Sequence, residues 1–159
     1  LQGGSGDDDF TLVTRGQISG TIDGGTGAET NGDTLIITAA SQTVNITDAS
    51  NIEEYIASGA DSTFEVSTGD NAWNITDNGD GTVAGVSFTN FANLQGGSGD
   101  DDFTLVTRGQ ISGTIDGGTG AETNGDTLTI SADSQTVNIT DASNIEEYIA
   151  SGVDSTFEV

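Results

Sequence analysis

The sequence predicts an all-β fold of short strands joined by Gly- and Asp-rich turns, arranged as a parallel β-helix or β-roll solenoid. Residues 1–66 recur as residues 94–159 without a gap, and the two copies differ at only four positions. Short segments of alternating apolar and polar residues also recur, most of them nine or ten residues apart. A fixed long period is typical of stacked arrays, and short strands separated by turn residues are typical of all-β folds.

The chain divides into a complete repeat unit, residues 1–93, and a second, truncated copy, residues 94–159. One difference between the copies predicts which side chains face the core. Ile36 becomes Thr129, whereas Leu35 and Ile37 keep their identity in the second copy. Because alternate residues of a strand point to the same side, we expect Leu35 and Ile37 to point inward. The same pattern predicts further inward residues, namely Phe10, Leu12, Val44, Ile46, Phe64, Val66 and Trp73.

The regular spacing favours coils of two strands and roughly 18–20 residues, so that a unit makes about five coils and adds about 24 Å of length. The stretch GTGAETNG is longer than the other separators and predicts a small loop insertion. The alternative architecture is a row of antiparallel β-sandwich modules of about 90 residues each.

The charge composition excludes some partners and favours others. The chain has 26 acidic residues against Arg15 and Arg108, which gives a formal net charge of −24. This field opposes binding to nucleic-acid phosphates and favours divalent cations. Leu, Ile, Val and Phe make up 35 of the 159 residues, just above the roughly 20% typical of disordered acidic chains. We therefore expect a thin core that depends on counter-ions, with the two arginines paired to acids on adjacent coils.

The stretch GGSGDDDFT, Gly3 to Thr11, fits the nonapeptide pattern G-G-x-G-x-D-x-U-x and recurs at Gly96–Thr104. In this pattern glycines allow a sharp turn, an aspartate offers a carboxylate to calcium, and the next apolar residue anchors the strand. An interrupted version starts at Gly24 and places Asp33 two residues before Leu35. The predicted Ca²⁺ ligands are Asp7, Asp8, Asp9 and Asp33, with their counterparts Asp100, Asp101, Asp102 and Asp126. The alternative is a solvated turn whose acids cap neighbouring strands.

These nonapeptides resemble those of RTX-type secreted bacterial proteins. The longer stretch WNITDNGDGTVAGVSFTNFANLQGGSGDDDFTL, which crosses the junction between the copies, is similar to repeats of very large bacterial surface and filamentous-haemagglutinin-like proteins. The resemblance implies a β-roll that folds on calcium after secretion and serves adhesins, matrix proteins or toxins. Each unit holds one strict nonapeptide, so the resemblance implies isolated calcium sites.

We expect a structural role and no enzymatic activity. The chain has no His, Cys or Lys, so carboxylates and tyrosines are the only general acids and bases. Nearly identical copies suit a calcium-stabilised stalk or filament of an extracellular or cell-surface bacterial protein, with neighbouring repeats as partners or a head-to-tail homo-oligomer. The alternative is an adhesive domain that binds a carbohydrate or a surface. A polysaccharide-acting enzyme is a second alternative that the sequence favours less. Without an initiator Met or a signal sequence, the chain is expected to be a segment of a longer protein. Its secretion is an expectation from the acidic composition and from the resemblance. No apolar run is long enough for a membrane span.

Overall fold

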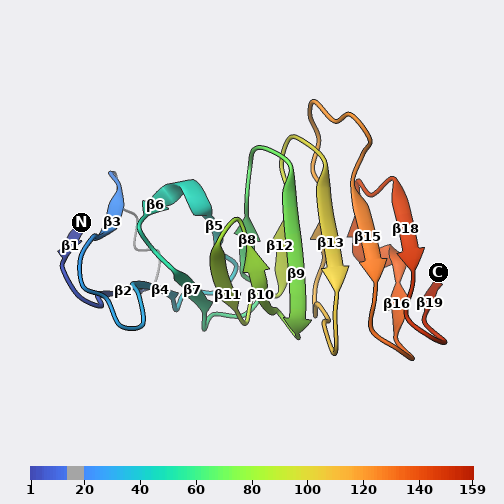
Figure 1. Cartoon of the computed structure of the whole chain (residues 1–159), viewed down its shortest axis with the longest axis horizontal. Coiled ribbons are helices and arrows are strands. Elements are labelled where there is room, and N and C mark those ends of the chain that lie inside the picture. Colours follow the sequence, from blue (N-terminus) through green and yellow to red (C-terminus); the bar gives the residue numbers. More distant parts are fainter. Residues whose placement is uncertain (14–19) are drawn as a thin grey trace.

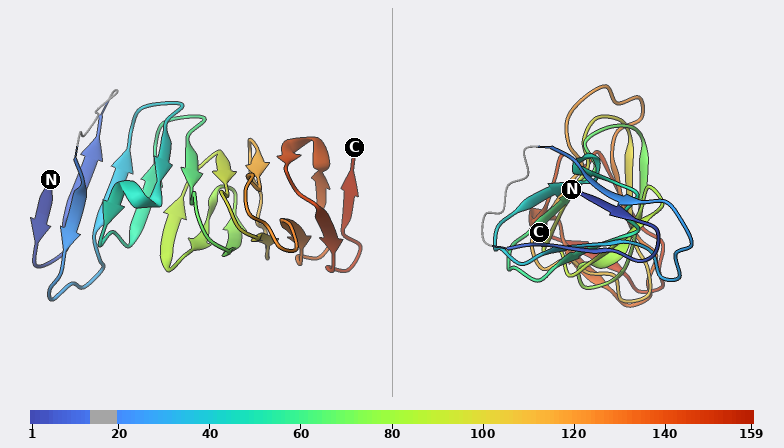
Figure 2. Two further views of the ribbon diagram at one scale, coloured as in Figure 1. Left: turned by 90° about the horizontal axis from the view of Figure 1, so that it is seen from above. Right: turned by 90° about the vertical axis from the view of Figure 1, so that its left-hand side faces the viewer.

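The computed structural model describes residues 1–13 and 20–159, and in these residues the chain is built from short β-strands. The strands follow one another along a single long axis, and the two termini lie at opposite ends of it (Figures 1 and 2). The helical elements of the described residues are two short 3₁₀ segments, η1 (Ile46–Asp48) and η2 (Ile139–Asp141). The prediction of an all-β fold is therefore confirmed.

The described strands form one large sheet and three smaller ones. The largest sheet contains, in spatial order, β18 (Glu147–Ala150), β15 (Thr127–Ile130), β13 (Asp101–Leu105), β9 (Asn71–Asp77), β10 (Asp80–Val83), β11 (Val86–Thr89), β7 (Glu54–Ala57), β4 (Thr34–Ile37) and β2 (Asp9–Leu12). The five-stranded sheet contains β17 (Ala142–Ser143), β14 (Ile115–Asp116), β12 (Asn93–Gln95), β8 (Thr63–Glu65) and β5 (Thr43–Asn45). The remaining sheets are β1 (Gln2–Gly4), β3 (Ile22–Gly25) and β6 (Ala49–Ser50), and the pair β16 (Thr136–Asn138) and β19 (Thr156–Glu158).

Most strand pairs are parallel, as a β-helix or β-roll requires and an antiparallel sandwich does not. The exception is the meander β9–β10–β11, whose strands pair antiparallel. Its two turns contain Gly79 and Gly85, both with positive φ, a conformation that glycine adopts without steric cost. The meander lies within residues 67–93, the third of the unit that has no counterpart in the second copy. We call residues 67–93 the connector.

The spacing between paired strands is less uniform than the sequence predicted. The step from Phe10 of β2 to its partner Leu35 of β4 is longer than the next step, from Leu35 to Tyr55 of β7. The longer step contains GTGAETNG, the predicted loop insertion, which runs from the last residue of β3 toward the start of β4. A longer step still, from Tyr55 to Phe88 of β11, contains two strands of the meander.

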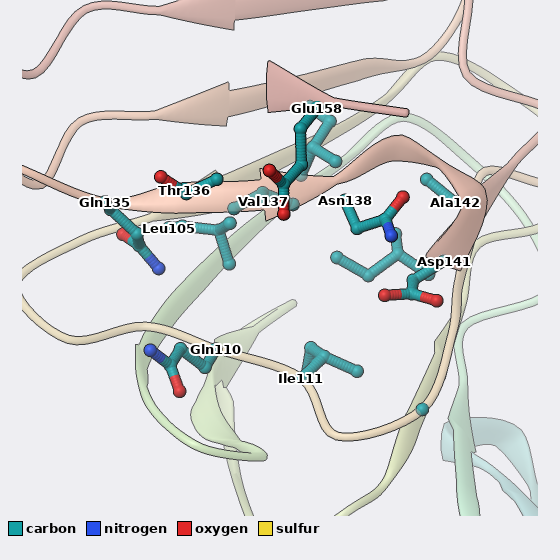
Figure 3. A pocket seen from close by; sticks show the side chains of 13 residues that line it. Leu105, Gln110, Ile111, Gln135, Thr136, Val137, Asn138, Asp141, Ala142 and Glu158 are labelled. Atoms are coloured by element: carbon teal, nitrogen blue, oxygen red, sulfur yellow. The ribbon is translucent and has the colours of Figure 1, made fainter. Parts of the chain in front are cut away.

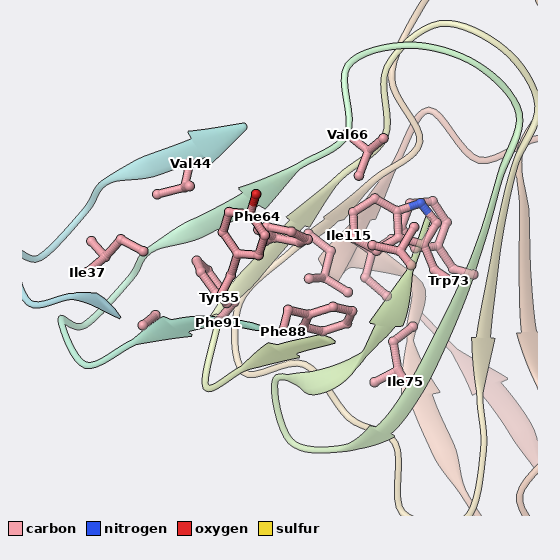
Figure 4. Close-up of a cluster of buried hydrophobic side chains, with 14 of the residues drawn as sticks. Ile37, Val44, Tyr55, Phe64, Val66, Trp73, Ile75, Phe88, Phe91 and Ile115 are labelled. Atoms are coloured by element: carbon pink, nitrogen blue, oxygen red, sulfur yellow. The ribbon is translucent and has the colours of Figure 1, made fainter. Parts of the chain in front are cut away.

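The core follows the predicted alternation. Leu35, Ile37, Val44, Phe64, Val66 and Trp73 are buried, and Phe10, Leu12 and Ile46 pack against them half-buried. An aromatic cluster forms where the first copy meets the connector (Figure 4). Its centre is Phe64, whose ring centroid lies 5.0 Å from Tyr55 and 5.1 Å from Phe91. Trp73 stacks on Phe103 at 5.1 Å, so the cluster continues into the second copy.

Candidate cation-binding clusters

Three acidic side chains from separate parts of the chain converge in each copy. In the first copy one carboxylate oxygen from each of Glu29, Asp33 and Glu53 lies within 4.8 Å of the others. Glu29 lies in the GTGAETNG loop, whereas Asp33 and Glu53 come directly before β4 and β7. These two strands pair in parallel, with Thr34 opposite Glu54, so the residues that precede them lie side by side.

The second copy builds the same cluster from Glu122, Asp126 and Glu146. Thr127 of β15 pairs with Glu147 of β18, which again sets the preceding acids beside each other.

The central aspartate of each cluster is buried and only partly hydrogen-bonded. Asp33 and Asp126 are each 1% exposed. Their Oδ1 atoms accept a hydrogen bond from the backbone N–H of Asp8 and Asp101, both at 2.7 Å. Their Oδ2 atoms have no hydrogen-bond partner in the part of the chain that the structure describes. Buried polar atoms are rarely left unpaired, because desolvation without a partner is costly. A bound cation or a proton would supply the missing partner.

The backbone holds the acids of each cluster in place. The backbone N–H of Asp33 donates to Oε2 of Glu53 at 2.7 Å, and that of Asp126 donates to Glu146 in the same way at 2.7 Å. Glu53 and Glu146 thus each accept a hydrogen bond from the backbone just before the neighbouring strand of the sheet, which is β4 in the first copy and β15 in the second. This arrangement leaves one oxygen of each glutamate for another partner.

Glycine makes room for the buried carboxylates. A Cβ atom added at Gly24 would overlap Oδ2 of Asp33, and one at Gly117 would overlap Oδ2 of Asp126. Asp8 lies against Gly3 in the same manner. The interrupted motif at Gly24 therefore keeps the geometry of the strict nonapeptide, although four additional residues separate its glycine from its aspartate.

Without a bound cation, burial and repulsion between neighbouring carboxylates disfavour the ionised forms of acids in these clusters. Burial raises the pKa of Asp126 to about 6, a shift that the nearby carboxylates of Glu122, Asp101 and Glu146 increase and a hydrogen bond from the Asp101 backbone opposes. Burial, together with the charges of Asp33 and Glu53, also raises the pKa of Glu29. Three carboxylate oxygens at this separation match the oxygen ligands that hard cations such as Ca²⁺ prefer.

The predicted ligands Asp7 and Asp100 lie outside these clusters and cap loops. Oδ1 of Asp7 accepts the backbone N–H of Thr30 at 2.7 Å, and the N–H groups of Asn31 and Gly32 also point to this carboxylate. Asp100 makes the equivalent bonds to residues 123–125. These backbone hydrogen bonds lower the pKa of both carboxyl groups. Asp7 and Asp100 thus accept backbone hydrogen bonds from neighbouring loops, an arrangement close to the alternative prediction of a solvated turn whose acids cap neighbouring segments.

The other predicted ligands have different surroundings. Asp101 is buried, and its oxygens accept hydrogen bonds from the side chains of Asn71 at 2.8 Å and Trp73 at 3.4 Å and from a backbone N–H. Burial is the main cause that raises its pKa. Asp8 is half-buried beside Gly3, whereas Asp9 and Asp102 are exposed on their strands. Of the eight predicted residues, the clusters contain Asp33 and Asp126.

The sequence reasoning missed the four glutamates, Glu29, Glu53, Glu122 and Glu146. A signal for two of them is present in the sequence. Asp8 precedes the inward Phe10 by two residues, Asp33 precedes Leu35, and Glu53 precedes Tyr55. An acid two residues before a large inward side chain would have identified Glu53 and its counterpart Glu146.

One further feature is a cavity of about 280 Å³ in the second copy (Figure 3). Leu105, Ile111 and Val137 line its apolar part, and Gln135 and Glu158 contribute polar groups. Oε1 of Gln135 is buried and has no hydrogen-bond partner among the described residues.

The two arginines were expected to pair with acids on adjacent coils. Arg108 lies 3.7 Å from Asp77, which ends the strand beside β13, and both side chains are exposed. Arg15 lies outside the described residues. None of the helices in residues 1–13 and 20–159 is long and apolar enough to cross a membrane.

No protein-family model, curated protein or solved structure matches this chain.

Proposed function

We propose that this chain is a structural repeat segment, a β-solenoid that acts as the stalk or filament of a large extracellular bacterial protein. The observation that carries the proposal is the continuity of two sheets across the copies. β7 of the first copy and β13 of the second belong to one nine-stranded sheet, and β8 pairs directly with β12. Seen end on, successive segments overlap around one axis (Figure 2). Copies joined in this way add length without adding a new kind of surface.

The added length follows from the strand order. Six strand-to-strand steps separate β2 from its counterpart β13 in the nine-stranded sheet. At roughly 4.8 Å per step, a unit adds about 29 Å, more than the roughly 24 Å expected from five coils, because the meander contributes extra strands. Small-angle X-ray scattering of the chain and of a chain with one further repeat unit tests this. An increase in the longest dimension of less than half the expected length would contradict a stacked array.

We further propose that Ca²⁺ binds the two Glu–Asp–Glu clusters and stabilises the fold. Support comes from the buried, unpaired Oδ2 atoms of Asp33 and Asp126 and from the net charge of −24. A bound calcium ion would supply positive charge to three carboxylates from a loop and two adjacent strands. The clusters have few protein ligands, which is typical of the weaker, extracellular class of calcium sites, with Kd of about 10⁻⁴–10⁻³ M.

Circular dichroism of chelator-treated protein during a calcium titration, with magnesium as the control, tests this role. We expect a calcium-specific gain of β-signal or of thermal stability. The double variant Asp33→Asn and Asp126→Asn should lose this response, whereas Asp9→Asn and Asp102→Asn should keep it. A spectrum and a stability that calcium leaves unchanged would contradict the proposal.

The extracellular, RTX-like assignment is part of the same proposal and is supported by the nonapeptides and the acidic composition. A function as a ligand-binding adhesive domain is the second candidate, favoured by the cavity beside Gln135. Deleting one unit from a protein that contains several distinguishes the two. A stalk becomes shorter and keeps its binding, whereas an adhesive array loses binding out of proportion to its length.

A further inference from the structure

The end of the molecule formed by β18 and β19 exposes apolar side chains that are buried in the first copy. Tyr55 is buried, whereas its counterpart Tyr148 is half-buried. Phe64 is likewise buried, and its counterpart Phe157 is half-buried. Because the local sequences are nearly identical, the difference arises from what covers each copy.

The connector covers this end in the first copy. Its strand β11 pairs in parallel with β7, so that Phe88 lies beside Tyr55. Phe88 also stacks on Phe64 at 5.6 Å, and Phe91 lies 5.1 Å from the same ring (Figure 4). At the junction of the connector and the second copy, β12 pairs with β8. Among the described strands, β18 of the second copy is the outermost strand of its sheet and β19 pairs only with β16.

Hydrogen bonds add specificity to this contact. The backbone N–H of Ser87 donates to the carbonyl of Glu53 at 2.8 Å, and the side chain of Asn90 donates to the carbonyl of Ala57 at 2.6 Å. Thr89 Oγ1 donates to the carboxylate of Glu54 at 3.2 Å. The three acceptor residues recur in the second copy as Glu146, Ala150 and Glu147. The second copy therefore presents the same acceptors and the same aromatic surface.

The opposite side of the connector contacts the copy that follows. β9 pairs in parallel with β13 along five residues, and Trp73 stacks on Phe103. The side chain of Asn71 donates to buried Asp101, and the backbone N–H of Asp100 donates to Asp70. The connector thus has two faces, one for the end of a copy and one for the start of the next.

We propose that the connector is a two-faced adaptor, and that the β18–β19 end is a docking surface for the connector of another repeat unit. The inference rests on the stacked-array part of the proposed function. Edge strands recruit further strands through their free backbone groups, and the aromatic side chains of the connector supply the matching apolar surface. In the described part of the largest sheet the end of one copy reaches the next copy only through the connector, because β13 pairs with β9 and not with β7. In the five-stranded sheet β8 and β12 pair directly.

The test appends residues 67–93 after Val159, in frame, and compares this extended chain with the original. The control extension carries Trp73→Ser, Phe88→Ser and Phe91→Ser in the added segment only, so its length and charge are unchanged. Hydrogen exchange is followed in Glu147–Ala150, the counterpart of the strand that pairs with β11 in the first copy. We expect the native extension to slow exchange there by about tenfold or more, since this strand loses its free edge. The control extension should leave exchange as in the original chain.

A second readout keeps the test decisive if the extension is only partly ordered. In a Trp73→Phe background, the added tryptophan reports its own burial, and docking should shift its fluorescence to shorter wavelength. Unchanged exchange together with a solvent-exposed tryptophan would overturn the inference. Protection in the original chain that depends on protein concentration would also overturn it, because a second copy would then cover the end. The calcium response of the same samples tests the proposed function separately.

Discussion

Replacement of the buried Asp126 by asparagine in calcium-free protein tests how the acidic clusters contribute to stability. The side chains are nearly equal in size, so the change removes the charge and leaves the packing. Oδ2 of Asp126 is buried without a partner among the described residues, and the carboxyl group is surrounded by Glu122, Asp101 and Glu146. The ionised form is therefore the unfavourable one when no cation is bound.

The magnitude follows from the pKa. Burial and the neighbouring carboxylates raise the pKa of Asp126 from 3.8 to about 6. At 1.36 kcal/mol per pH unit this is about 3 kcal/mol, and screening by solvent at the partly exposed glutamates reduces it to about 1–3 kcal/mol. A folded-state pKa above the unfolded value means that the folded state binds more protons. The stabilisation is therefore complete below pH 3.8 and is lost as the pH rises through 6.

The assay is urea unfolding followed by the fluorescence of Trp73, the only tryptophan, at several pH values with and without calcium. The repulsion among the other acids is the same in the original chain and in Asp126→Asn. It therefore drops out of the difference between their unfolding free energies. Without calcium, the unfolding free energy of the original chain should fall by about 1–3 kcal/mol relative to that of Asp126→Asn between pH 4 and pH 7. At pH 7, calcium at about 100 times its Kd should restore about 2.7 kcal/mol in the original chain.

Asp102→Asn is the matched control, because Asp102 is exposed on β13 and removal of its charge leaves the cluster intact. Its stability should follow the pH and the calcium concentration as the original chain does. A stability difference for Asp126→Asn that is independent of pH would refute the reasoning, and so would an undiminished calcium response.

Three further predictions concern packing and loops. Trp73→Ala should destabilise the chain by about 3–5 kcal/mol in urea unfolding followed by circular dichroism, because this buried ring joins Phe88 to Phe103. Gly117→Ala should cost about 1–3 kcal/mol through overlap with Asp126, whereas Gly4→Ala, whose added Cβ meets no atom within 4 Å, should change the unfolding free energy by less than about 0.5 kcal/mol. Asp100→Asn should speed hydrogen exchange in residues 123–125, and in the original chain acidification below the ordinary aspartate pKa should have the same effect, because backbone hydrogen bonds lower the pKa of Asp100. Equal exchange in the variant and the original chain would show that the loop is held by other contacts.

The all-β class, the repeat and the inward faces of the strands could be predicted from local sequence patterns. Alternation with a period of two is a local property, so Leu35 and Ile37, which are kept in both copies, could be assigned to the core without knowledge of their neighbours. The pairing of Asp33 with Gly24 was also readable, because the interrupted nonapeptide keeps its glycine and its acid.

Which acids meet and which apolar residues are covered depends on contacts between segments far apart in the sequence. Glu29 and Glu53 join Asp33 because the parallel register of β4 and β7 brings a loop and two strand starts together, and no local pattern contains that register. Tyr55 and Tyr148 occupy identical local sequences, yet only Tyr55 is fully buried. Burial depends on what packs against a strand. The connector strand β11 packs against β7, which carries Tyr55, whereas β18, which carries Tyr148, has a neighbour on one side among the described strands.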